Sequence, residues 1–169
     1  ADPEAAARLH PNDRKRIVRA LEVFQQTGKT ISQHNRETRA LPLRYDALTL
    51  SLAFQRREDM WARIDRRVDE MMAAGLAEEG RALLDSGVPV RCTAMQAIGY
   101  KEMAAALRGG GDVCAAAEEI KLRSRQYAKR QLTWFRRTEG AKWLFWGPEP
   151  DFEAACRTST KYLEEFGLV

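Results

Sequence analysis

The sequence predicts a mainly α-helical fold with one or two strands. Apolar residues recur at helical spacing through most of the chain, and capping residues or glycines stand where these segments begin and end. Only residues 47–54 (ALTLSLAF) and 142–146 (KWLFW) have the pattern of strands. Because two strands form a marginal sheet, we expect a piece of a larger protein whose sheet lies partly in a missing segment.

The first 45 residues are expected to hold three helices. Asp2 caps the first helix, and Asn12 or Asp13 in the turn HPND caps the second, which ends at Gly28. A third helix follows and breaks at Leu41-Pro42. The three helices are expected over 3–10, between Asp13 and Gly28, and over 32–39.

Residues 46–169 are expected to begin with the strand 47–54, which is apolar enough to be covered on both faces. Glycines at 75, 87, 109–111 and 140 end the helices that follow. These helices are expected over 57–74, 76–86, 94–107, 113–137 and 151–165, with the strand 142–146 before the last.

The composition is that of a globular protein without a membrane span. Of 169 residues, 44% are hydrophobic and 31% charged, and no stretch approaches the roughly 20 apolar residues that cross a bilayer. The net charge of +4 points to an anionic partner. Three cysteines without a CxxC pair argue against a disulfide framework and favour a reducing, cytoplasmic compartment.

The helix 113–137 carries the strongest chemical signal. Between Ile120 and Thr138 it has seven basic residues and no acidic one. At 100° per residue, one face around Ile120 is expected to pack, leaving two basic rows that either bind a polyanion or form a solvated face. The residues expected on the packing face are Ser124, Tyr127, Gln131, Trp134 and Phe135. Gln131 there either hydrogen-bonds within the core or reaches a bound base.

Two further segments offer cations or aromatic rings. In the helix 57–74, Arg66 faces away from the apolar stripe, whereas Arg67 lies on its shoulder and suits either a phosphate or a salt bridge to a neighbouring Glu. Gly99 stands inside a predicted helix, which indicates close approach of a ligand or of another helix. Beside it, Tyr100 suits stacking on a base and Lys101 suits a phosphate, or both belong to ordinary helix packing.

Catalytic and metal-binding patterns are not found. The sequence offers no Ser/His/Asp or Cys/His set and no His/Cys cluster with metal-ligand spacing. The residues by themselves therefore indicate a helical protein that binds an anion, most simply a nucleic acid.

Four segments, in this order, resemble the C-terminal half of the bacterial tRNA dimethylallyltransferases (tRNA isopentenyltransferases). The segments are LHPNDRKRIVRALEVFQQTGK (9–29), RIDRRVDEMMAAGLAEE (63–79), MQAIGYKE (95–102) and RQYAKRQLTWFRR (125–137). The resemblance implies the C-terminal part of an α/β transferase similar to P-loop kinases. Residues 1–45 would be the end of its helical insertion, and residues 46–169 the C-terminal strand and helical region in which the chain returns to the core of the enzyme.

The resemblance also implies an activity. The family transfers a dimethylallyl group from dimethylallyl diphosphate to the exocyclic amine of the adenosine 3′ of the anticodon, which must be flipped out of its stack to be reached. The implied partners are the tRNA anticodon stem-loop and dimethylallyl diphosphate, with Mg²⁺ as cofactor and its ligands in the missing half. The intact enzyme is expected to be a monomer that is not bound to a membrane.

Site residues follow from the same resemblance. Arg67 resembles an arginine that contacts the diphosphate. For Gln131, the resemblance favours contact with a bound base over a hydrogen bond within the core. The residues that resemble tRNA contacts are Lys15, Arg16, Arg19, Gln96, Gly99, Tyr100, Lys101, Lys129, Arg130, Gln131, Thr133, Trp134 and Arg136.

The chain departs from the family in lacking its GxTxxGKT phosphate loop and general-base Asp. Gly28-Lys29-Thr30 is the only GKT and is interpreted as a helix stop, because no strand and glycine-rich loop precede it. The fragment alone is therefore expected to be inactive. The alternative hypothesis is a stand-alone helical nucleic-acid-binding module without catalysis.

Overall fold

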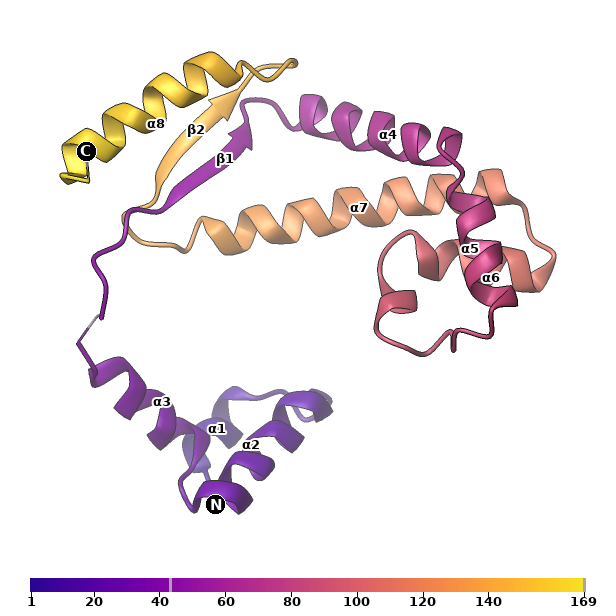
Figure 1. The fold of residues 1–169 in the computed structure, drawn as a ribbon. Helices are drawn as coiled ribbons and strands as arrows, with labels where there is room; N and C mark the ends of the chain where they lie inside the picture. The colour runs from indigo at the N-terminus through magenta and orange to yellow at the C-terminus, as the bar shows by residue number, and fades with distance from the viewer. Residues whose placement is uncertain (43, 169) are drawn as a thin grey trace. The chain divides into compact units, whose positions relative to one another are not determined.

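The computed structural model describes residues 1–42 and 44–168 and confirms a mostly helical chain with two strands (Figure 1). The chain divides into two compact units, residues 1–47 and 48–169. The first unit contains helices α1 (Pro3–Arg8), α2 (Arg14–Thr27) and α3 (Ile31–Ala40). The second contains β1 (Leu50–Phe54), α4 (Arg57–Ala73), α5 (Leu76–Asp85), a 3₁₀ turn η1 (Ala94–Gln96), α6 (Tyr100–Gly109), α7 (Val113–Phe135), β2 (Lys142–Trp146) and α8 (Phe152–Phe166).

Helix caps hold the first unit together. The Asp2 carboxylate accepts hydrogen bonds from the backbone N–H of Ala5 and of Ser32, both at 3.0 Å, and so joins the starts of α1 and α3. These bonds, with that from Ala5 first, hold the pKa of Asp2 below its usual value. Arg36 and Glu4 form a second link between the same two helices.

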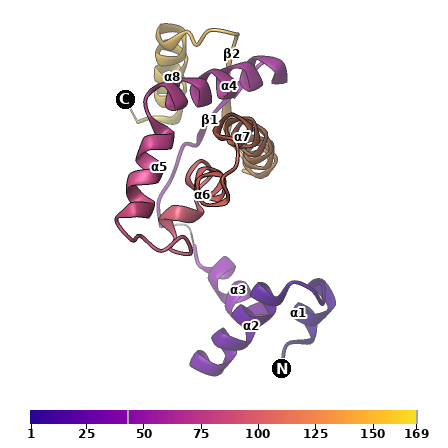
Figure 2. The same cartoon turned by 90° about the vertical axis from the view of Figure 1, so that its right-hand side faces the viewer.

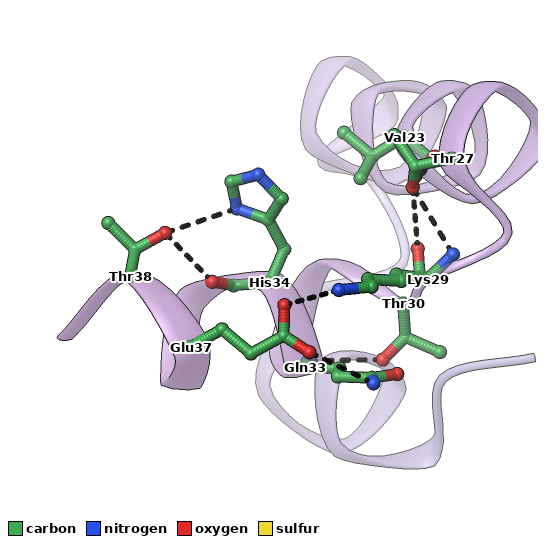
Figure 3. A network of polar contacts seen from close by, with 8 residues as sticks. All are labelled: Val23, Thr27, Lys29, Thr30, Gln33, His34, Glu37 and Thr38. Atoms are coloured by element: carbon green, nitrogen blue, oxygen red, sulfur yellow. Dashed lines mark hydrogen bonds and ion pairs between the residues drawn. The ribbon is translucent and has the colours of Figure 1, made fainter. Parts of the chain in front are cut away.

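Gly28 ends α2, as predicted. Thr30 caps α3, which starts at Ile31, one residue before the predicted start, and Figure 3 shows the contacts of Lys29 and Thr30 there. Gly28 has a φ of +70°, a left-handed conformation that favours glycine at a helix C-terminus. The Thr30 side chain accepts from the N–H of Gln33 at 3.1 Å, and the Lys29 ammonium pairs with Glu37 at 2.7 Å. Each residue of the GKT sequence thus has a local structural role.

In the second unit, β1 and β2 pair in parallel, from Leu50 beside Lys142 to Phe54 beside Trp146. Helix α8 lies against β2, with the rings of Trp146 and Phe152 5.3 Å apart. The expectation that β1 is covered on both faces is wrong for the described residues. Leu52 is 53% exposed because this part of the chain supplies only two strands and little to cover them.

The core of the second unit lies where α4, α5, α6 and α7 meet (Figure 2). Met103 and Ile120 are 0% and 1% exposed. Gly80 of α5 permits close packing on α6, since a Cβ there would lie 3.2 Å from Met103 Cγ. The core residues are Val68, Leu76, Met103, Ala116 and Ile120.

The expected continuous helix over 94–107 is wrong. The chain forms η1, becomes extended at Ala97, and starts α6 only at Tyr100. Gly99 has a φ of +108°, and its N–H donates to the Glu102 carboxylate at 2.9 Å. No atom lies within 4 Å of where a Cβ would stand. Backbone conformation, rather than close approach of a ligand or helix, therefore explains this glycine.

Candidate nucleic-acid interface

Helix α7 packs on a different side from the one the sequence predicted. Between Ile120 and Arg137 the half-buried residues are Lys121, Ser124, Arg125, Ala128 and Leu132. All other residues from 121 to 137 are exposed. Tyr127, Gln131, Trp134 and Phe135 were expected to pack but are exposed, Trp134 by 67%. Gln131 is therefore not a core residue, and an aromatic pair, Trp134 against Phe135 at 5.4 Å between centroids, faces outward.

Cations in the first half of α7 are neutralised by carboxylates. The Lys121 ammonium lies 2.7 Å from Asp69 of α4 and 2.8 Å from Glu118, and these hydrogen bonds, with Asp69 first, raise the pKa of Lys121 well above its usual range. Arg125 pairs with Asp65 of α4 at 2.7 Å. Arg123 pairs with Glu119 one turn earlier, at 2.6 Å.

Cations in the last two turns of α7 and in the two residues after it have no such partners. Lys129, Arg130, Arg136 and Arg137 form no ion pair with any residue in 1–42 or 44–168. The Arg130 guanidinium instead lies 5.6 Å from the centroid of the Tyr127 ring. We call these four cations, together with Trp134, the α7 surface. It is the arrangement that binds single-stranded nucleic acid, in which cations hold phosphates and an aromatic ring stacks on a base.

A hollow of about 780 Å³ lies between the α7 surface and the start of α4. Lys129, Thr133 and Arg136 line it from α7, and Arg56 and Arg57 line it from the other side. Arg57 lies 4.5 Å from the Trp61 ring centroid, so the ring supports its guanidinium. The sequence analysis missed Arg56 and Arg57, although the run QRRED directly after a strand was a signal that could have found them. The Thr133 hydroxyl donates to the Lys129 carbonyl at 2.9 Å.

A second groove, of about 620 Å³, brings Gln96 and Lys101 together with Arg130. The Gln96 amide donates to the Val90 carbonyl at 2.7 Å, which orients it at the edge of the groove. Lys101 is exposed and forms no ion pair within the described part of the chain. Three of the residues predicted to contact tRNA, from segments 30 positions apart, thus line one groove.

Tyr100 and Gly99 serve packing in this structure. Tyr100 is half-buried against the core, and its hydroxyl donates to Glu79 at 2.7 Å. This hydrogen bond, together with burial, raises the pKa of Tyr100 above its usual value. Gly99 is buried. Ordinary helix packing therefore accounts for Tyr100 in this structure, and a positive φ accounts for Gly99.

Arg67 is exposed on α4 and forms no ion pair within residues 1–42 and 44–168. Its neighbour Arg66 instead pairs with Glu149 at 3.3 Å. The salt bridge to a neighbouring Glu that was the alternative for Arg67 is thus not formed among these residues. Arg67 does not line the hollows along α7.

The first unit holds the remaining predicted contacts, Lys15, Arg16 and Arg19, all exposed on α2. Arg16 pairs with Asp13 at 3.4 Å and Arg19 with Glu22 at 3.6 Å, both weakly because the side chains are solvated. Lys15 forms no ion pair with the residues that the structure describes. Val18 and Leu21 of the same helix are about half exposed.

A helical scaffold that displays unpaired cations around an exposed tryptophan has the charge and the aromatic ring that polyanion-binding proteins use. The family model described as "IPP transferase" matches residues 1–138. The chain therefore belongs to the IPP transferase family, which confirms the resemblance drawn from the four sequence segments.

Relatives and solved structures agree with this family. The chain is 50% identical over 143 residues to the tRNA dimethylallyltransferase of Geobacter sulfurreducens, covering 85% of this chain and 46% of the relative. It is 45% identical to that of Bacillus subtilis, over 90% of this chain and 48% of the relative. A solved tRNA isopentenylpyrophosphate transferase from Bacillus halodurans matches 98% of this chain and 49% of its own, with 36% identity and a TM-score of 0.68. The chain thus spans about half the length of the relatives it matches.

A third match includes RNA recognition. A eukaryotic dimethylallyltransferase, solved as snapshots of the enzyme acting on tRNA, matches 98% of this chain and 44% of its own, with a TM-score of 0.76 and 28% identity. Among the described residues, no helix combines the length and the apolar character needed to span a membrane.

Proposed function

We propose that this chain forms the tRNA-binding part of a tRNA dimethylallyltransferase. The intact enzyme transfers a dimethylallyl group from dimethylallyl diphosphate to the exocyclic amine of the adenosine 3′ of the anticodon. The observation that carries the proposal is the set of unpaired cations around Trp134, in a chain of the IPP transferase family. Seven basic residues between Ile120 and Thr138, on α7 and directly after it, repel one another unless carboxylates or phosphates neutralise them, and four of the seven lack a described carboxylate.

Base extrusion explains why an exposed aromatic ring belongs beside these cations. An amine in a stacked anticodon loop is reached only when its base leaves the stack, and the unstacked loop then needs new π-partners. Trp134 and Gln131 are exposed on the α7 surface, so they supply a stacking face and an amide for base edges. Lys129, Arg130 and Arg136 bind the flanking phosphates.

Arg67 is proposed to contact the diphosphate of the prenyl donor. Its guanidinium is exposed and makes no ion pair within the described residues, so it is available for bidentate binding of phosphate oxygens. Cations there take up the charge that develops on a diphosphate leaving group. Mg²⁺ would share this role, but residues 1–42 and 44–168 hold no group of three acidic, His or Cys side chains that fits the ion. We assign no residue of this chain to it.

RNA binding over a salt series tests the proposal. A tRNA anticodon stem-loop should bind with a steep salt dependence, and the change Lys129→Ala with Arg136→Ala should lower the slope of log Kd against log salt by about 1.4, since each phosphate contact on an unpaired strand contributes about 0.7. The control is Arg123→Ala with Arg157→Ala, because both of these arginines are already paired with glutamates. An unchanged slope in the first variant would show that Lys129 and Arg136 do not meet phosphate.

Measurements with the prenyl donor distinguish a transferase from a stand-alone RNA-binding module. In the full-length transferase, Arg67→Ala should reduce prenyl transfer and donor affinity far more than tRNA affinity. Equal losses in both would remove Arg67 from the donor site. The 169-residue chain by itself is expected to bind tRNA without transferring the prenyl group, because it has no phosphate loop of the GxTxxGKT type.

A further inference from the structure

We propose that the RNA-binding surface extends beyond α7 to a second cationic hollow, formed by Arg91, Lys101 and Arg108, which binds the sugar-phosphate backbone of a paired RNA stem. The inference rests on the proposed function and deepens it, because it assigns a different part of the same RNA to a different part of the protein. Arg91 and Arg108 were not singled out by the sequence analysis. We call these three cations and the hollow they line the α6 patch.

The α6 patch is a defined depression. It has a volume of about 420 Å³ and lies between the loop before η1 and the outer side of α6. Met95, 2% exposed, and Ala104, 6% exposed, form its apolar floor. Arg91, Lys101 and Arg108 are exposed around this floor, one from the loop and two from α6.

Its charge is uncompensated. None of the three cations forms an ion pair with another described residue, and no acidic side chain lines the hollow. Elsewhere in the same unit, surface cations commonly have carboxylate partners, as Arg123, Arg157 and Lys161 do. Three like charges around one depression repel one another unless an anion with repeated charges lies across them, and a nucleic-acid backbone is such an anion.

The patch is continuous with the α7 surface. Gln96, Lys101 and Ala105 line both the α6 patch and the groove that contains Arg130. Gln126 and Arg130 in turn line both that groove and the hollow at Trp134. The connecting groove also contains the carboxylates of Glu102, Asp112 and Glu119, which are bound to the Gly99 N–H, the Cys114 N–H and Arg123. One RNA molecule can therefore extend from an unpaired loop at Trp134 and Arg130 to a paired stem at Lys101 and Arg91.

The two ends of this surface differ in a way that assigns them to different RNA structures. The hollow at the α7 end includes the exposed Trp134 ring, which stacks on unpaired bases. No aromatic side chain lines the α6 patch, where cations rim an aliphatic floor. Such a surface contacts phosphates and gains nothing from unpaired bases, so it fits a base-paired stem, whose bases are turned inward and whose phosphates are outside.

Fluorescence anisotropy with two RNA probes tests the proposal. One probe is an anticodon stem-loop, and the other is an unpaired strand with the loop sequence alone. The variant Arg91→Gln with Arg108→Gln should lower the salt slope for the stem-loop by about 1.8, and so weaken its binding about tenfold more at 50 mM than at 200 mM salt. Binding of the unpaired strand should change less than twofold. The matched control is Arg81→Gln with Arg157→Gln, which removes two exposed arginines that do not line the patch.

The outcomes distinguish this proposal from the one on which it rests. If the stem-loop keeps its affinity and salt slope in the Arg91/Arg108 variant while Lys129→Ala with Arg136→Ala still weakens binding, the α6 patch does not contact RNA and the α7 proposal stands. Equal losses for both probes would also overturn the stem assignment. If the unaltered protein binds neither probe in a salt-dependent way, the proposed function itself fails. Circular dichroism spectra of the variants should match the unaltered protein, because the substituted side chains are exposed.

Discussion

The basic run that begins in α7 and ends at Arg137, just after the helix, has two halves with similar numbers of cations and opposite surroundings. Up to Arg125, each cation after Ile120 meets a carboxylate, and two of these carboxylates, Asp65 and Asp69, come from α4. Beyond Arg125, Lys129, Arg130, Arg136 and Arg137 have no ion-pair partner among the described residues. The first half also contributes Ile120 to the core, whereas Trp134 in the second half is two-thirds exposed.

Charge density along a helix therefore does not by itself identify a binding surface. Asp65 and Asp69 make half of the basic run part of the fold. At the start of α4, Glu58 lies near its own neighbours Arg56 and Arg57 and forms no ion pair with the other half of the basic run among the described residues. The first half should therefore determine stability and the second half RNA binding.

The largest effect is expected from Ile120→Ala. Ile120 is 1% exposed and packs with Val68, Leu76 and Met103, so truncation should lower the free energy of unfolding by about 2–5 kcal/mol. Urea denaturation followed by circular dichroism measures this change. RNA affinity at low temperature, where the variant remains folded, should be nearly unaltered. A stability loss below about 0.5 kcal/mol would contradict the packing described for this half.

Trp134→Ala should have the opposite profile. Its ring is exposed, so the free energy of unfolding should change by no more than about 0.5 kcal/mol. RNA binding should weaken by about 1–3 kcal/mol through loss of base stacking, with little change in the salt slope. Trp134→Phe is the matched variant and should recover most of the affinity. A loss of stability without a loss of affinity would show that Trp134 belongs to the fold.

Much of this division was hidden from the sequence, although most of the fold was not. Helix ends were predicted where local chemistry decides them. The side chains of Asp13 and Asp151 cap the starts of α2 and α8, and the left-handed backbone of Gly28 ends α2. Gly99 was misplaced inside a helix because a positive φ leaves no trace in apolar periodicity. The strand 47–54 was found, but its burial depends on what covers it, which periodicity cannot show.

The sequence predicted which residues make up the candidate site but not which side of α7 faces the solvent. Projection from Ile120 gathered Tyr127, Trp134 and Phe135 on one face, and apolar rings on one face were taken to pack. The structure instead buries a side roughly 100° away, through Lys121, Arg125, Ala128 and Leu132, and of the predicted residues only Ser124 is half-buried as expected. An arginine can lie there because Asp65 of α4 receives it. That pairing joins residues 60 positions apart, which a single helical projection cannot include.

Freeing a cation in the first half should turn it into a binding residue. Glu119 holds Arg123, which lines the same groove as Arg130. Glu119→Gln should therefore strengthen stem-loop RNA binding up to about tenfold at 50 mM salt and steepen the salt slope by about 0.9. The cost in stability should be about 0.3–0.5 kcal/mol, the value of an exposed pair one turn apart. Glu153→Gln is the control, because it frees Arg157 on α8, away from the groove. Unchanged RNA binding in Glu119→Gln would mean that pairing does not separate the two halves.

The smallest effect compares the two lysines of α7 in amine acylation. Asp69 and Glu118 keep the pKa of Lys121 above its usual range, and its side chain is only 13% exposed, whereas Lys129 is exposed. A raised lysine pKa favours folding at every pH below the unfolded value of about 10.4, and that contribution is lost only as pH rises through the folded-state pKa. At pH 7–9 the ion pair should thus remain intact, and Lys121 should react several-fold more slowly than Lys129, as measured by mass spectrometry. Stem-loop RNA should protect Lys129 and leave Lys121 unchanged. Protection of both lysines to the same extent would place RNA along the whole helix and contradict the division between its halves.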